Sequence, residues 1–158
     1  MKLKPLYRIR FDYPQSWSVE VAGEAGKEVH LLLFAEGRAE HGLVGRFRGA
    51  NAPRKRTDGP FETEFHGVIE ADDGAVILVE YQEFGRAYRE PYKTQSPNRR
   101  QWVATAKHLS ADPRYVYLND TVCVGTGEVR PKPEGATASN PTELVLDVAE
   151  LVWEPTPD

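Results

Sequence analysis

A run of alternating apolar and polar residues, interrupted by Asp73-Gly74, constrains the fold of this chain more than any other feature. The run FETEFHGVIEADDGAVILVEY covers residues 61–81, and both halves alternate with the period of two that is typical of β-strands. Asp-Gly is among the strongest short hairpin signals, because glycine tolerates the positive φ of a two-residue type I′ turn. The sequence therefore predicts an antiparallel hairpin whose loop is Asp73 and Gly74.

A two-residue loop also determines which residues of the hairpin face one another. Counting outward from the loop places His66 opposite Tyr81 and Glu64 opposite Glu83. Two carboxylates directly across a strand pair repel each other, so the alternatives are a raised pKa at one of them, a cation between them, or two solvated glutamates without coupling. The polar face points either into a barrel or out to solvent, and a shift of one residue would exchange the faces.

Strand patterns also dominate the rest of the chain. Residues 6–13 alternate, and Pro14, which has no N–H to donate, is expected to end that strand. Further strands are predicted at residues 28–37, 42–49, 101–109 and 115–127. Many short strands joined by turns rich in glycine and proline indicate an all-β barrel or sandwich.

The segment at residues 141–153 permits two interpretations. A proline and an acid near its start are compatible with a helix, whereas its β-branched residues and its alternation favour a strand. Long polar loops are predicted at residues 86–100 and 130–141. We favour the strand, and we expect one domain over residues 1–158, an all-β closed antiparallel barrel of about 8–10 strands.

The composition excludes several classes of protein. The formal net charge of −4, from 20 basic and 24 acidic residues, argues against general binding of nucleic acid. Cys123 is the sole cysteine, so an intramolecular disulfide and a cysteine-based metal site are excluded. The sequence has no apolar run of the roughly 20 residues that span a bilayer and no apolar signal segment at its start. We expect a cytoplasmic protein that does not bind membranes, and no nucleotide-binding or hydrolase motif indicates a cofactor.

Three stretches carry a resemblance to a known family. They are GPFETEFHGVIEADDGAVILVEY, RYVYLNDTVCVGTG and ELVLDVAELV, and their strongest elements are Asp73-Gly74-Ala75, Ile77 and Tyr117-Leu118-Asn119. Over roughly residues 6–153 the chain resembles the domain-of-unknown-function family 3237, whose members are small, mostly bacterial proteins. The resemblance implies a closed antiparallel β-barrel and supplies no established reaction.

The hairpin provides the candidate catalytic residues His66, Glu64 and Tyr81. A histidine exchanges protons near neutral pH, a nearby glutamate would orient its ring, and a tyrosine could donate to a developing oxyanion. This set suits proton abstraction beside a carbonyl or an isomerisation. The alternative is a cross-strand pair on a partly exposed face. Glu62, Glu64 and His66 spread along one strand, so no metal site is predicted.

Five further residues are candidates for ligand binding: Arg46, Arg48, Glu83, Tyr117 and Asn119. An inward arginine would bind a carboxylate or phosphate, although basic residues that balance acidic strands are the ordinary alternative. Asn119 either fixes a turn through the backbone or lines the mouth of the barrel.

Three functions follow as hypotheses. The first is an enzyme that performs acid–base chemistry on a small carbonyl-bearing or aromatic molecule. The second is a carrier of an apolar or anionic ligand, and the third is a structural barrel that forms homo-oligomers.

Overall fold

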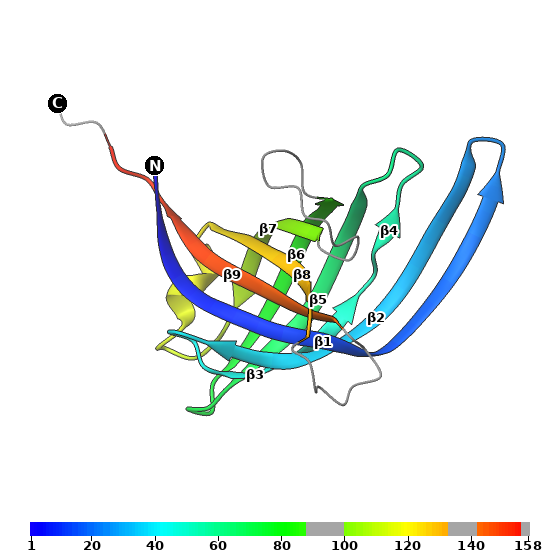
Figure 1. Cartoon of the computed structure of the whole chain (residues 1–158). Helices are drawn as coiled ribbons and strands as arrows, with labels where there is room; N and C mark the ends of the chain where they lie inside the picture. The colour runs from blue at the N-terminus through cyan, green and yellow to red at the C-terminus, as the bar shows by residue number, and fades with distance from the viewer. Residues whose placement is uncertain (88–99, 133–141, 156–158) are drawn as a thin grey trace.

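The computed structural model describes residues 1–87, 100–132 and 142–155 (Figure 1). The strands are β1 (Lys2–Gly23), β2 (Gly26–Glu40), β3 (Gly45–Asn51), β4 (Arg54–Lys55), β5 (Phe61–Ala71), β6 (Val76–Ala87), β7 (Arg100–Leu109), β8 (Cys123–Pro131) and β9 (Thr142–Val152). Within the described ranges the only helical element is the short 3₁₀ helix η1 (Val116–Asp120). The loops predicted at residues 86–100 and 130–141 lie mostly outside these ranges.

The strands form one antiparallel sheet that closes on itself. Neighbouring strands follow the order β1-β9-β8-β7-β6-β5-β3-β2, and β2 pairs with β1 to complete the ring (Figure 1). The short β4 pairs with both β2 and β5. The predicted all-β, closed antiparallel fold is confirmed. The strand favoured at residues 141–153 is also confirmed, because β9 pairs with β1 on one side and β8 on the other.

The β5–β6 hairpin exists, but its loop is one residue longer than predicted. The N–H of Gly74 donates to the carbonyl of Ala71 at 2.9 Å, and the N–H of Ala71 donates to the carbonyl of Ala75 at 2.8 Å. Gly74 has a φ of +90°, the left-handed conformation that closes a three-residue loop through a bulge. The loop therefore consists of Asp72, Asp73 and Gly74.

The longer loop shifts the register of the hairpin by one residue. The observed pairs are Thr63–Glu83, Glu64–Gln82, Phe65–Tyr81 and His66–Glu80. The predicted pairing of His66 with Tyr81 and of Glu64 with Glu83 is therefore wrong. Because side chains alternate between faces, the shift moves Tyr81 and Glu83 to the face opposite His66 and Glu64.

Two predicted strand limits are also wrong. Pro14 does not end β1; it lies at a shift of register between Asp12 and Gln15, where an irregular ladder tolerates a residue without an N–H. Residues 116–120 form η1 instead of extended strand, and β8 begins only after this helix.

Aromatic side chains fill the middle of the ring. The rings of Phe47 and Phe65 stack with centroids 5.1 Å apart, and Phe11 packs against both. Gly49 and Gly67 lie beneath the ring of Phe65, because a Cβ on either glycine would come within 2.5 Å of its atoms. This aromatic layer closes the interior between the two ends of the ring.

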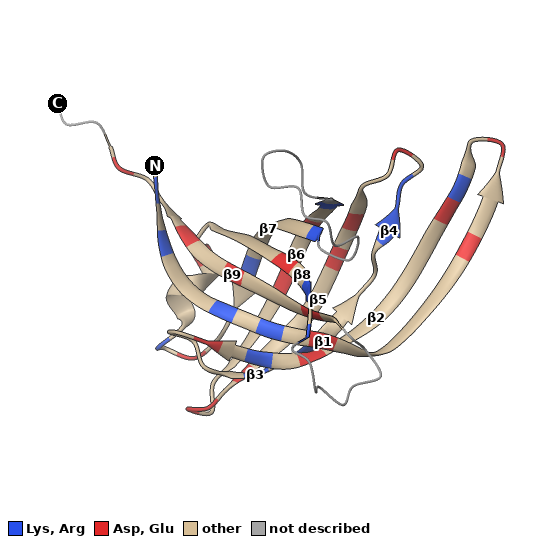
Figure 2. Ribbon diagram, viewed as in Figure 1, with Lys and Arg blue, Asp and Glu red and all other residues tan. Residues whose placement is uncertain are grey.

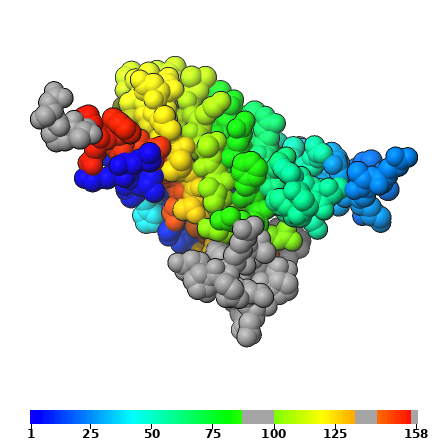
Figure 3. All heavy atoms as spheres, turned by 90° about the horizontal axis from the view of Figure 1, so that it is seen from above, coloured from blue at the N-terminus to red at the C-terminus, as the bar shows by residue number. Residues whose placement is uncertain are grey.

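The outer part of the β1–β2 pair extends beyond the ring as an arm, in which β2 also pairs with the end of β3 and with β4. The arm consists of Gln15–Gly23 and Gly26–Phe34, paired residue by residue. In the described part of the chain this section of β1 pairs with β2 alone, since β9 pairs with residues 2–11. Figures 1 and 3 show the arm projecting away from the body of the molecule.

None of the helices in the described ranges has the length and apolar character that crossing a membrane requires.

Candidate functional site

The residues of the predicted catalytic group lie on opposite faces of the sheet. The side chains of His66 and Glu64 are 60% and 69% exposed, with 3.4 Å between His66 Nε2 and Glu64 Oε1. Tyr81 is buried inside the ring. The structure thus brings His66 and Glu64 together but does not bring Tyr81 to them. The catalytic roles of His66, Glu64 and Tyr81 stay predictions. These roles were based on one shared site, and the three side chains do not share one.

Of the two alternatives for Arg46 and Arg48, the structure places them as basic residues that balance acidic ones, and their ligand-binding roles stay predictions. Arg46 and Arg48 both point outward, because Phe47 between them takes the inward position. Arg46 lies 3.3 Å from Glu36, and Arg48 makes two 2.8 Å bonds to the carboxylate of Glu70. Figure 2 shows that basic and acidic residues are interspersed along the strands. These arginines are matched by carboxylates on the outer surface.

Asn119 binds the backbone, one of the two roles predicted for it. Its side-chain amide donates to the carbonyl of Ser110 at 3.0 Å, and its side-chain oxygen accepts the Ser110 N–H at 2.8 Å. This reciprocal pair joins η1 to the end of β7. Tyr117, on the same helix, is 51% exposed and points away from the interior of the ring.

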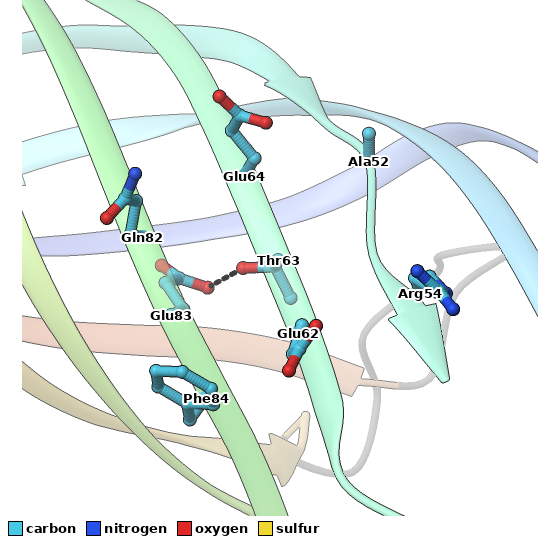
Figure 4. Close-up of a pocket in the computed structure, with 8 residues that line it drawn as sticks. All are labelled: Ala52, Arg54, Glu62, Thr63, Glu64, Gln82, Glu83 and Phe84. Atoms are coloured by element: carbon cyan, nitrogen blue, oxygen red, sulfur yellow. Dashed lines mark hydrogen bonds between the residues drawn. The ribbon is translucent and has the colours of Figure 1, made fainter. Parts of the chain in front are cut away.

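A depression at β5 and β6 is bordered by both outward-facing and inward-facing side chains (Figure 4). It has a volume of about 490 Å³ and is bordered by Ala52, Arg54, Glu62, Thr63, Glu64, Gln82, Glu83 and Phe84. Glu64, Gln82 and Phe84 are exposed, whereas Thr63 and Glu83 are buried and bonded to each other across the strands. Ion pairs between exposed side chains contribute little free energy, so the exposed polar groups of this depression are weak anchors for a ligand.

A smaller and more apolar cavity opens at one end of the ring interior. It measures about 270 Å³, and its walls include Leu31, Leu33, Phe61, Trp102 and Leu144. These side chains come from β2, β5, β7 and β9, so closure of the ring is what brings them together. Arg100 lies at this cavity with its guanidinium 4.8 Å from the centroid of the Phe61 ring. We call this space the mouth cavity.

Two buried polar atoms beside the mouth cavity lack partners. Among the described residues nothing forms a hydrogen bond with Trp102 Nε1 or with Asn51 Oδ1. The indole of Trp102 lies against Gly85, where a Cβ would come within 2.7 Å of the ring. Asn51 donates to the hydroxyl of Tyr13 at 2.7 Å, and Tyr13 lines the cavity. An unsatisfied buried donor and acceptor cost free energy, so their retention requires an explanation.

Glu83 lies one inward-facing position deeper than Trp102. It pairs with Ala104, two residues along β7 from Trp102, and its Oε2 accepts the hydroxyl of Thr63 at 3.0 Å. Burial raises the pKa of Glu83 to about 7, and the bond from Thr63 opposes this shift. Burial also raises the pKa of Tyr13, and the charge of Glu83 raises it further.

A second buried polar group lies beyond the aromatic layer. The hydroxyl of Tyr7 is hydrogen-bonded both to the hydroxyl of Tyr81, at 3.0 Å, and to Nε2 of His108. Burial lowers the pKa of His108 to about 4, so the imidazole is neutral at pH 7. Tyr81 therefore belongs to a structural polar chain that also includes a histidine not singled out by the sequence pattern.

Residues 1–87, 100–132 and 142–155 contain no group of three or more His, Cys, Asp or Glu side chains arranged to hold a metal ion.

The comparisons with known proteins agree with this architecture. The sequence model of a family described as "Protein of unknown function (DUF3237)" matches residues 1–151. The chain belongs to the DUF3237 family. No curated protein sequence matches it.

Solved structures share the fold of this DUF3237 protein at low sequence identity. A β-barrel-like protein from Acinetobacter baumannii AYE is 22% identical, with 94% of each chain covered and a TM-score of 0.73. A conserved protein of unknown function from Rhodopseudomonas palustris is 20% identical, with 96% of this chain and 97% of that chain covered and a TM-score of 0.71. A protein from Penicillium herquei described as an enzyme is 17% identical, with 93% of each chain covered and a TM-score of 0.61. At these identities the likeness concerns the fold alone.

Sequence reasoning identified Glu83 as a ligand-binding candidate but missed Tyr13 and Asn51 beside the cavity. The available signal was the alternation of residues 6–13, which places Tyr13 on the same face as the buried Phe11. Asn51 ends β3, whose other inward residues are apolar or glycine. A single amide side chain at such an inward position was the signal that could have identified Asn51.

Proposed function

We propose that this DUF3237 protein binds a small, largely apolar molecule that carries a carbonyl group, and that it does so in the mouth cavity. The observation that carries the proposal is the unpartnered pair Trp102 Nε1 and Asn51 Oδ1 beside an apolar cavity of about 270 Å³. Ligand sites typically combine apolar walls with a few polar groups that fix the orientation of the ligand.

The dimensions and walls of the cavity favour a compact ligand. Its volume of about 270 Å³ lies just below the roughly 300–1,000 Å³ found for small-molecule sites. Phe61 and Trp102 offer ring faces for stacking an aromatic or planar group. The indole N–H of Trp102 would donate to the carbonyl oxygen of the ligand, and Asn51 Oδ1 would accept from a hydroxyl or amide of the same molecule.

Glu83 does not line the mouth cavity, but it lies one inward-facing position deeper than Trp102, which suits an acid–base role next to the bound ligand. A carboxyl group with a pKa of about 7 exchanges protons readily at neutral pH, and burial produces this value without a neighbouring acid. We propose that Glu83 removes or returns a proton at the carbon next to the ligand carbonyl, while Trp102 stabilises the oxygen on which charge develops. The Penicillium herquei protein described as an enzyme supports the proposal only in that its fold is similar.

The binding step is tested by titrating ¹⁵N-labelled protein with acetophenone, with ethylbenzene as the matched compound without a carbonyl. The indole N–H signal of Trp102, assigned with Trp102→Phe, is expected to move with acetophenone and much less with ethylbenzene. Trp17 and Trp153 are 53% and 75% exposed and serve as internal controls. No movement at millimolar acetophenone, or equal movement with both compounds, would refute recognition of a carbonyl.

The chemical step is tested by deuterium incorporation into the methyl group of acetophenone in D₂O. The native protein is expected to accelerate this exchange, whereas Glu83→Gln is expected to bind acetophenone without accelerating it. Binding by both proteins with no acceleration by either would support the carrier hypothesis in place of the enzyme.

A further inference from the structure

The arm carries a stripe of exposed apolar side chains on one face. Trp17, Val19 and Val21 alternate along β1, and Leu32 and Phe34 lie on the same face of β2, opposite Trp17 and Gln15. The five apolar side chains are between 38% and 61% exposed, and the rings of Trp17 and Phe34 contact each other edge to face at 5.3 Å. We call these five residues the apolar stripe.

The stripe has no cover within the described part of the chain. The opposite face of the arm contributes Leu31 and Leu33 to the mouth cavity, whereas its β1 residues are exposed and polar or small. Between Val29 and its tip the arm has only two strands, and a two-stranded ribbon is only marginally stable in water. Contiguous apolar patches of roughly 300–600 Å² on a single chain are often functional. The arm therefore presents a surface that is suited to a protein partner.

We propose that the apolar stripe packs against the apolar stripe of a second copy of this chain, related by a two-fold axis close to Val19. The large side chains Trp17 and Phe34 lie at the base of the stripe, and the small Val19 and Val21 lie toward its tip. A two-fold axis at the middle of the stripe places the aromatic base of one copy on the valine tip of the other. Large side chains then meet small ones, as close packing of two sheets requires.

The charges beside the stripe suit a second copy better than a lipid surface. Glu28 and Arg54, which share this face near the tip, are bonded to each other at 2.6 Å. On the other face, Lys27 is bonded to Glu20 at 2.7 Å. The arm thus presents no excess of positive charge to anionic lipids, which amphipathic membrane-binding elements generally use. His30, which lies opposite Val19 on the same face, is 3.4 Å from Glu28, so the polar groups of this face have partners within one copy.

The area matches that of a modest dimer. Half-exposed side chains of two aromatic and three aliphatic residues offer on the order of 400–500 Å² per copy. Stacking two stripes would bury about 800–1,000 Å² of these side chains alone, and the flanking polar groups bring the total close to the lower limit of specific interfaces. A dimer that dissociates on dilution is therefore expected.

The test is sedimentation velocity of the full chain at about 1–200 μM, with the double variant Val19→Thr/Val21→Thr. Threonine keeps the shape and strand preference of valine, so this variant is expected to fold, and circular dichroism checks that it does. The matched control is Val76→Thr/Val122→Thr, at valines that are 55% and 63% exposed outside the arm. The native protein and the control are expected to dimerise, and the arm variant to dimerise at least about tenfold more weakly.

A second measurement does not depend on the strength of the dimer. Val19→Cys is expected to form an intermolecular disulfide under mild oxidation faster than Val76→Cys, since Val19 lies next to its counterpart only if the stripes stack about the proposed axis. A native protein that remains monomeric at 200 μM would overturn the proposal. So would an arm variant that dimerises normally, equal cross-linking of both cysteine variants, or sedimentation of monomers with phosphatidylcholine/phosphatidylglycerol vesicles.

Discussion

Replacing Glu83 with glutamine is expected to stabilise the protein above neutral pH and to leave it nearly unchanged in mild acid. Burial raises the pKa of this carboxyl group from the usual 4.5 to about 7. Between these values the folded chain holds a proton that the unfolded chain releases, so stability falls as the pH rises from 4.5 to 7. Each pH unit of this interval corresponds to about 1.4 kcal/mol, which amounts to ~3 kcal/mol in full.

Glutamine keeps the acceptor for the Thr63 hydroxyl and carries no charge, so it removes this loss. At pH 8.5 the free energy of unfolding of Glu83→Gln is expected to exceed that of the native protein by about 2–3 kcal/mol, or roughly 4–12 °C in melting temperature. At pH 5 the two proteins are expected to agree within about 1 kcal/mol.

The assay is urea unfolding of both proteins at several pH values, with Glu64→Gln as a matched control. Glu64 is 69% exposed, so its substitution is expected to leave the pH profile unchanged. Subtracting the native curve from the Glu83→Gln curve cancels the contribution of every other titrating group. A difference that is the same at pH 5 and pH 8.5 would refute the assignment of Glu83 as the buried acid.

Three other substitutions test separate parts of the structure. His108→Asn is expected to make the free energy of unfolding depend less on pH in acid. Burial lowers the pKa of His108 from 6.5 to about 4, so the native protein loses about 2–3 kcal/mol of stability as the pH falls through this interval. Urea unfolding at pH 4.5 and pH 7 measures the difference. Gly85→Ala is expected to cost about 1–3 kcal/mol and to shift the indole signal of Trp102, since the added Cβ lies 2.7 Å from that ring; an unperturbed indole signal would contradict this packing. Asn119→Ala is expected to cost about 1–2 kcal/mol and to speed hydrogen exchange at the Ser110 amide, whose acceptor it removes; unchanged exchange would show that another group satisfies this amide.

The hairpin illustrates how far a sequence pattern can lead. Alternation and Asp73-Gly74 correctly predict the two strands and the position of the turn between them. The same turn residues are compatible with a loop of two residues or of three, because Asp72 can also occupy a turn position. Periodicity does not distinguish the two loops, yet they differ by one residue in register. The one additional loop residue places Tyr81 and His66 on opposite faces of the hairpin.

The mouth cavity could not be predicted from the sequence, for a different reason. Its residues come from strands that are distant in the sequence, and their meeting depends on which strands become neighbours when the sheet closes. Alternation shows that Tyr13 and Trp102 can each face inward, but it does not show that they reach the same end of the ring. Local patterns thus predict the class of fold, whereas ring closure and register determine the site.

The shift of register at Pro14 has a consequence for how this architecture can diversify. Before it, β1 is a wall of the ring, held on both sides by β9 and β2; after it, the same strand has β2 as its described neighbour and belongs to the arm. Adding or removing two residues from each strand at the tip of the arm would preserve the face of every remaining side chain. Relatives could therefore change the length of the arm in paired steps, and acquire or lose a partner surface, while the ring and its mouth cavity stay as they are.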